Sequence, residues 1–183
     1  MTALLRFEHV VCRRDGRLLF DDLSFAVGPG EALQVVGPNG SGKSSLIRLA
    51  AGLLRAEQGQ VERSQLAMAD DALPLDRELT LKRALNFWRG DVDVAMERLG
   101  LSHLAQVPVR LLSSGQRKRA SLSRLAASGA PLWLLDEPLN ALDADGAERL
   151  GRLIADHRTS GGAVLAASHQ PLAGDWQRLE LRA

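Results

Sequence analysis

The sequence predicts an α/β fold with a mainly parallel core sheet, and two observations support this prediction. Residues 33–36, 131–135 and 163–167 are short segments suited to strands buried on both faces. Segments with helical spacing separate them, as in parallel sheets. Polar residues follow each segment, and ligands bind such sheets beyond the carboxyl ends of the strands. The polar groups expected at this edge are 37–44, Asp136 with Glu137, and Ser168 with His169.

A phosphate-binding loop is predicted directly after the first of these strands. The pattern G-x-x-x-x-G-K-[ST] occurs there between strand and helix, which disfavours a glycine-rich turn that binds nothing. Glycines let backbone N–H groups approach a polyphosphate, and the helix N-terminus adds donors. Lys43 is expected to bridge the β- and γ-phosphates of ATP, and the Ser44 hydroxyl to bind Mg²⁺. The residues predicted to bind ATP are Gly37, Pro38, Asn39, Gly40, Ser41, Gly42, Lys43, Ser44 and Ser45.

Length and composition indicate one globular domain. The chain has 183 residues, 25% of them charged, and a net charge of +1, so no global field attracts nucleic acid or anionic lipid. Its one cysteine, Cys12, excludes an internal disulfide and a cysteine-based zinc cluster, and a buried, inert thiol is expected. Residues 1–11 do not resemble a signal peptide, and no run of 18 apolar residues occurs. A membrane role is therefore expected to depend on a partner.

The remaining elements are predicted from periodicity and turn residues. The N-terminal part is expected to be antiparallel, with strands at 4–11 and 18–27 around a turn at 13–17, and a short strand beginning at Val61. Glycines that follow periodic segments predict where helices end. The expected helices are 79–88, 92–99 before Gly100, one from 113–116 through Ala127 before Gly129, and one around 150–154 before Gly161.

Two acids end the second apolar strand. Asp136 is positioned to bind Mg²⁺ directly or through water, and Glu137 to polarise a water against the γ-phosphate. Glu137→Gln should then keep ATP binding and lose turnover. A solvated turn is the alternative, and the phosphate loop disfavours it.

Residues 112–116, Leu-Ser-Ser-Gly-Gln, resemble the signature of ATP-binding cassette (ABC) proteins, with Ser114 in place of the first glycine. Ala141 to Asp143 resemble the loop that follows the catalytic acid of that family, and His169 resembles its switch histidine. The resemblance implies a head-to-tail dimer in which the signature, Ser113, Ser114, Gly115 and Gln116, acts on the partner's ATP. Singly, these residues also fit a helix cap and a structural histidine; their joint order favours the functional interpretation.

Basic residues after the signature allow another interpretation. Arg117, Lys118, Arg119 and Arg124 could contact nucleic acid, but no aromatic residues are interleaved with them, so a solvated helix face is favoured.

The resemblance to ABC proteins covers essentially the whole chain, and three segments resemble one branch of that family in particular. Residues 113–119, 131–138 and 168–172 resemble CcmA proteins, the ATP-binding subunits of cytochrome c maturation systems. The branch implies a P-loop NTPase of the ABC type, with one ATP-binding domain at 1–183 and a helical subdomain at about 70–128. It implies ATP and Mg²⁺ as cofactors, and a cytoplasmic, peripheral position on the inner face of the membrane beside a CcmB-like permease. Hydrolysis would release a haem-loaded chaperone. No nucleic acid partner and no direct haem ligand are expected.

The sequence departs from the ABC pattern at two places. The glutamine expected between phosphate loop and signature is missing from 69–74, where Ala72 takes its position and Asp71 or a water could substitute. The aromatic residue that stacks on adenine is expected near Arg13, Arg14 and Asp15, where an arginine plane could serve instead.

Three other functions are compatible with a phosphate-binding loop. One is an ATPase subunit of another small ABC importer or exporter, and a second is a soluble ABC-type ATPase acting on nucleic acid or ribosomes. The third, a phosphate-loop kinase or GTPase, would leave 112–116 and His169 unexplained, and no Asn-Lys-x-Asp stretch occurs.

Overall fold

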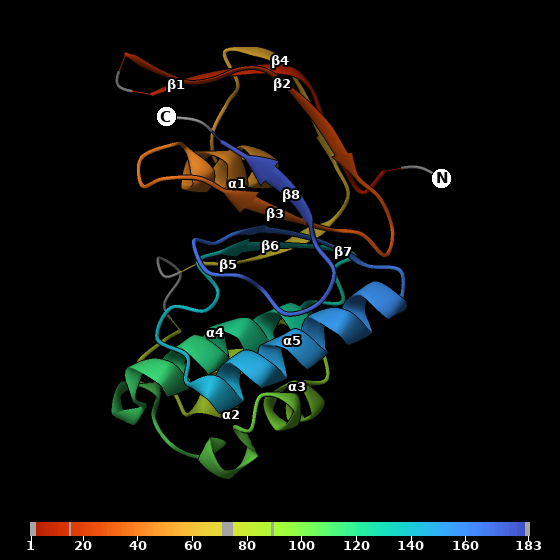
Figure 1. Cartoon of the computed structure of the whole chain (residues 1–183). Helices are drawn as coiled ribbons and strands as arrows, with labels where there is room; N and C mark the ends of the chain where they lie inside the picture. The colour runs from red at the N-terminus through yellow and green to blue at the C-terminus, as the bar shows by residue number, and fades with distance from the viewer. Residues whose placement is uncertain (1–2, 15, 71–74, 89, 182–183) are drawn as a thin grey trace.

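The chain is arranged in layers, as Figure 1 shows for the computed structural model. The structure describes residues 3–14, 16–70, 75–88 and 90–181. An antiparallel sheet forms one outer layer, a five-stranded parallel sheet lies in the middle, and helices form the other outer layer. Helix α1 (Lys43–Ala51) lies between the two sheets.

The antiparallel sheet has the strand order β2-β1-β4. Its strands are β1 (Leu5–Arg14), β2 (Arg17–Val27) and β4 (Gln58–Arg63). In β1, buried Leu5 and Phe7 alternate with exposed residues, and a shift in register at His9 restores burial at Val10 and Cys12. Cys12 is buried as predicted, and burial raises the pKa of its thiol.

The middle sheet is parallel throughout and has the order β5-β6-β7-β3-β8. Its strands are β3 (Ala32–Val36), β5 (Leu66–Ala69), β6 (Leu132–Asp136), β7 (Ala163–Ala167) and β8 (Gln177–Glu180). The predicted fold, a parallel core sheet with an antiparallel N-terminal part, is confirmed. The three predicted strands are the central ones. The sequence did not predict β5 and β8, because both are edge strands of only four residues with little buried surface, and β8 is mostly polar.

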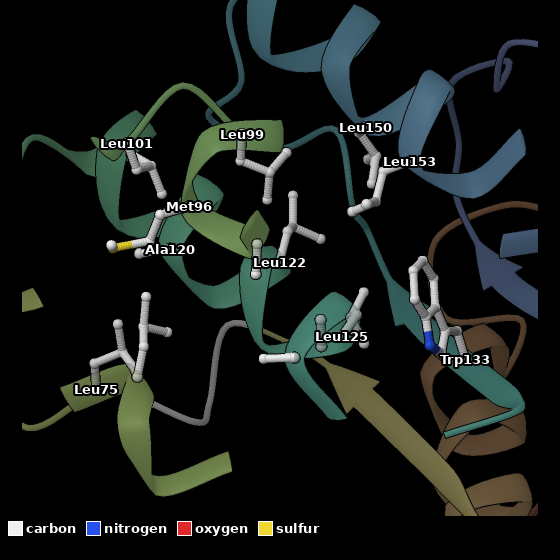
Figure 2. Packing of buried hydrophobic residues seen from close by; sticks show 14 of the residues in the cluster. Leu75, Met96, Leu99, Leu101, Ala120, Leu122, Leu125, Trp133, Leu150 and Leu153 are labelled. Carbon is white, nitrogen blue, oxygen red and sulfur yellow. The ribbon is translucent and has the colours of Figure 1, made fainter. Parts of the chain in front are cut away.

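Two apolar clusters cover the two faces of this sheet. Side chains alternate along a strand, so Leu132 and Leu134 pack toward α1 and the antiparallel sheet, while Trp133 and Leu135 pack toward the helices. The helices on that side are α2 (Leu81–Leu85), α3 (Val92–Arg98), α4 (Ser114–Ser128) and α5 (Ala144–Thr159). Figure 2 shows this side, where buried side chains of α3, α4 and α5, among them Met96, Leu122 and Leu150, belong to one cluster.

The helix boundaries follow the sequence signals with one difference. Gly129 ends α4 with a φ of 63°, as predicted. The helix expected at 79–88 is α2 followed by a 3₁₀ turn at Asn86–Trp88. Further 3₁₀ turns lie at Ser102–Leu104 and Val109–Leu111. In the part of the chain that the structure describes, no helix combines the length and apolar character that a membrane span needs.

The prediction of a solvated basic face on α4 is wrong for two of its four residues. Lys118 and Arg124 are only 7% and 5% exposed. The Arg124 guanidinium donates to the Met68 carbonyl oxygen at 3.4 Å, so it satisfies backbone on the edge strand β5. Sequence periodicity could not show this, because the contact depends on β5 lying beside α4.

His157 of α5 stacks flat on Trp133 of β6. The ring centroids are 3.8 Å apart and the planes are inclined by 6°. Burial lowers the pKa of His157, and hydrogen bonding to the backbone of Ala163 and Pro131 offsets part of this effect. The neutral imidazole is therefore the form that the fold favours.

This stack predicts a loss of stability in mild acid. Because the pKa of His157 is lower in the folded chain than in the unfolded chain, the unfolded chain binds the proton more readily as the pH falls below about 6.5. The free energy of unfolding, measured with urea between pH 8 and pH 5, should decrease more steeply in the wild type than in His157→Phe. His103→Gln, at an exposed histidine, should keep the wild-type steepness. Equal slopes in wild type and His157→Phe would contradict the prediction.

Candidate active site

The predicted phosphate loop connects the end of β3 to the start of α1. Gly42 precedes α1 with a φ of 100°, and Gly40 has a φ of 83°. At Gly37, an added Cβ would lie 2.5 Å from the carbonyl oxygen of Leu181, so the neighbouring segment requires glycine there. The Lys43 ammonium donates to the carbonyl oxygens of Gly37 at 2.9 Å and Pro38 at 3.0 Å. These bonds hold the lysine over the loop.

Ser44 and Asp136, the two predicted Mg²⁺ ligands, lie in contact. The Ser44 hydroxyl donates to Asp136 Oδ1 at 3.1 Å, although 92 residues separate them in sequence. Burial raises the pKa of Asp136, the bond from Ser44 opposes this, and the neighbouring charge of Glu137 adds to it. The positive charge of Arg48 lowers this pKa, and Asp70, which follows β5, raises it. Negative charge therefore gathers where a cation is expected.

Glu137 and His169, the two predicted catalytic residues, also lie in contact. Glu137 Oε2 is 2.8 Å from His169 Nδ1 and 3.5 Å from the His169 backbone nitrogen. Glu137 has a φ of 46°, and its N–H donates to the Ala167 carbonyl oxygen at 2.9 Å. This left-handed backbone conformation occurs directly after β6, which ends at Asp136.

A cleft of about 540 Å³ lies over the phosphate loop. Glu137 lines it, and so do Arg14, Arg17 and Leu19 of the β1–β2 hairpin. Arg14 belongs to the stretch predicted to replace the adenine-stacking aromatic, while Asp15 is outside the described residues. Sequence reasoning missed Arg17 and Leu19. The sequence held a signal for Arg17, because a hairpin with its turn at 13–17 places Arg17 opposite Arg14, and the structure pairs these two residues.

The signature residues begin α4 and form its cap. Ser113 Oγ accepts from the Gln116 N–H at 3.1 Å, and Gln116 Oε1 accepts from the Ser113 N–H at 2.9 Å. An added Cβ on Gly115 would lie 2.9 Å from the Ala141 carbonyl oxygen, so the signature packs closely on that loop. A hydroxyl that accepts a bond can still donate its own proton. The helix-cap interpretation therefore does not exclude a phosphate contact.

The structure does not bring the signature to the phosphate loop of the same chain. Ser114 lines a separate cavity of about 380 Å³ with Arg117, Asn140 and Ala141, and the residues lining the two cavities do not overlap. Asp143, the predicted dimer-loop residue, caps α5 by accepting from the Gly146 N–H at 2.8 Å. Its role across a dimer stays a prediction.

One predicted departure from the family pattern cannot be placed. Asp71 and Ala72, at the position of the missing glutamine, are outside the residues that the structure describes. Of that stretch, Ala69 ends β5 and Asp70 follows it.

Comparison with known proteins agrees with this geometry. A family model described as ABC transporter matches residues 20–140. The "Cytochrome c biogenesis ATP-binding export protein CcmA" of Sphingopyxis alaskensis is 55% identical over 181 residues, covering 94% of this chain and 93% of the relative. The chain belongs to the CcmA family of ABC transporter ATP-binding proteins. The Zymomonas mobilis member is 49% identical and covers 98% of this chain and 85% of its own length.

Solved structures support the same fold. A structure titled "Structure of ATP binding subunit of ABC transporter" superposes with a TM-score of 0.83 and covers 91% of this chain and 79% of its own. At 21% identity it shows the fold alone. The family match and the CcmA relatives confirm the resemblance drawn from the signature and from residues 131–138, and nucleotide binding follows from the family.

The close approach at Gly37 gives a prediction about the phosphate loop. Gly37→Ala should abolish ATP binding and lower the free energy of unfolding, because its Cβ would meet rigid backbone of Leu181. Gly129→Ala is the matched control outside the phosphate loop: its φ is also positive, but no atom lies within 4 Å of the added Cβ. It should cost about 1–2 kcal/mol through backbone strain only. Calorimetric ATP titration and urea unfolding measure both effects, and equal losses in the two variants would disprove the steric argument.

Proposed function

We propose that this chain is the ATP-hydrolysing subunit of a membrane ABC complex that serves cytochrome c maturation. The names of its relatives support the cellular role. One observation carries the hydrolysis: the Glu137–His169 contact lies beside the Ser44–Asp136 contact and the phosphate loop, at one edge of the parallel sheet. A binding loop, a candidate metal site and a candidate base are thus assembled in one place.

The proposed reaction uses Glu137 as general base. The phosphate loop and Lys43 bind the β- and γ-phosphates in the cleft. A water attacks the γ-phosphorus and gives a proton to Glu137, while the bond from the γ-phosphorus to the bridging oxygen breaks. ADP and inorganic phosphate leave. His169 keeps the Glu137 carboxylate directed at the water through the 2.8 Å contact.

The donor set at Ser44 and Asp136 fits Mg²⁺. This ion prefers oxygen ligands and takes only one or two from the protein, the others coming from water and phosphates. The 3.1 Å contact places a hydroxyl and a carboxylate oxygen together. Among the described residues, no cluster of three or more histidine, cysteine, aspartate or glutamate side chains suggests a site for another kind of metal. When bound, Mg²⁺ would offset negative charge on the phosphates.

A second copy of the chain would complete the site. Because the signature lines a cavity separate from the phosphate loop, Ser113 to Gln116 and Asp143 would act on ATP held by the partner in a head-to-tail homodimer. The N-terminus of α4 offers N–H donors suited to a phosphate.

The proposed partner in the membrane is a permease subunit of the CcmB type. The chain would lie peripherally on the cytoplasmic face of the membrane. ATP hydrolysis would drive haem export by causing release of a haem-loaded chaperone. No direct haem ligand in this chain and no nucleic acid partner are proposed.

Glu137→Gln tests the catalytic assignment. The variant should bind ATP normally, lose at least about 100-fold in kcat because it cannot accept the proton, and accumulate as an ATP-bound dimer. Phosphate release and light scattering after size-exclusion chromatography measure this. Glu148→Gln, at an exposed surface pair, is the matched control and should retain wild-type turnover. Normal turnover in Glu137→Gln would reject the assignment.

Mixing two inactive variants tests action across the dimer. Ser113→Asp keeps a helix cap but places a negative charge against the partner's γ-phosphate, while Lys43→Ala disables the phosphate loop. Each should be inactive alone. An equal mixture should recover about a quarter of wild-type turnover, since half of the dimers would hold one intact site. An inactive mixture would contradict the head-to-tail arrangement.

Genetic complementation tests the cellular role. In a bacterium that lacks its own CcmA, the wild-type chain should restore c-type cytochromes, measured by haem staining, and Glu137→Gln should not. Failure of the wild type, despite ATP hydrolysis in vitro, would favour another ABC transporter or a soluble ABC ATPase.

A further inference from the structure

Gln34 is a buried amide in an otherwise apolar strand. It lies in β3, three residues before the phosphate loop, and is 2% exposed. Its strand neighbours Leu33 and Val35 face the opposite side of the sheet and belong to an apolar cluster. Burying an amide is unfavourable unless it forms hydrogen bonds. A polar side chain at this place therefore requires partners that make its burial tolerable.

Its partners lie on both sides of His169. Gln34 Nε2 donates to the Gln170 carbonyl oxygen at 2.8 Å and to the Ser168 carbonyl oxygen at 3.4 Å. The side chain of Ser168, fully buried, closes the same turn: its Oγ donates to the Gln170 carbonyl oxygen at 3.0 Å and accepts from the Gln170 N–H at 3.1 Å. The backbone on each side of His169 is thus tied to β3.

This turn determines where the His169 ring points. The histidine side chain is half-exposed, so packing alone does not fix it. Its backbone and ring nitrogens lie 3.5 Å and 2.8 Å from Glu137 Oε2, and both belong to the turn that Gln34 and Ser168 hold. Glu137 is anchored separately, through its N–H on Ala167. The position of His169 in the Glu137–His169 contact therefore depends on β3.

We propose that Gln34 is a positioning residue: its amide holds the Ser168–Gln170 turn so that His169 meets Glu137. It also joins the strand that carries the phosphate loop to this contact, so that the two parts of the site keep a fixed relation. The catalytic consequence depends on the proposed ATP hydrolysis, whereas the effect on His169 does not.

Two substitutions remove the hydrogen bonds from Gln34 to the turn in different ways. Gln34→Leu has similar size, suits the buried sheet, and lacks the N–H donor. Gln34→Glu has the same shape but puts an acceptor oxygen against two carbonyl oxygens. The matched control is Leu33→Val, which shortens a buried side chain (5% exposed) of the same strand on the opposite face. It perturbs β3 without touching the turn.

The first readout is the NMR signal of the His169 ring in the full chain, which has four histidines. His169→Ala identifies the signal. Gln34→Leu and Gln34→Glu should shift or broaden it, and Leu33→Val should leave it in place. An unmoved signal in both Gln34 variants would overturn the proposal, even if the chain had no ATPase activity.

The second readout separates positioning from general destabilisation. Gln34→Leu should lower kcat about 10-fold through misplacement of His169, with the Kd for ATP and the KM unchanged. In a His169→Ala background, Gln34→Leu should lower kcat by less than about a further 2-fold, because the histidine that it would misplace is already absent. A loss of equal size in both backgrounds, or full turnover in Gln34→Leu, would refute the positioning role. A wild type without turnover would instead reject the proposed function.

Discussion

The parallel pairing of β3, β7 and β6 is the constraint on which the rest of this structure depends. Because all three strands run in the same direction and in register, their carboxyl ends meet at one edge of the sheet. The phosphate loop, the Asp136–Glu137 pair and His169 all follow those ends. The 3.1 Å and 2.8 Å contacts of the site result from this arrangement, although they join residues 92 and 32 positions apart. The apolar clusters on both faces keep the strands in place.

Several side chains with proposed functions also stabilise local structure. Ser113 caps α4 and Asp143 caps α5, and both are proposed to act on a partner's nucleotide. The two roles are compatible, because a hydroxyl or carboxylate oxygen has more bonding capacity than one cap uses. Gly115 connects these two regions by packing on the Ala141 carbonyl oxygen. The start of α4 and the loop before α5 are therefore held as one surface.

Buried polar groups mark the places where the fold departs from a simple apolar core. Gln34 and Arg124 are buried and His157 is partly buried, at places where an unbonded polar group is unfavourable. Gln34 and Arg124 satisfy backbone carbonyl groups of a loop and of an edge strand, and His157 is kept neutral against Trp133. Each connects segments that the sequence keeps far apart.

The sequence by itself determined the phosphate loop, the central strands, the helix ends and the order of the family motifs. These are local properties, since glycine placement, strand alternation and capping residues act over a few neighbouring positions. Tertiary structure alone decided the rest. It added β5 and β8 at the sheet edges, buried Lys118 and Arg124, brought Arg17 and Leu19 to the cleft, and tied Gln34 to a turn more than 130 residues away. Each of these features depends on which distant segments become neighbours when the sheet forms, and no periodicity within a segment specifies its neighbour.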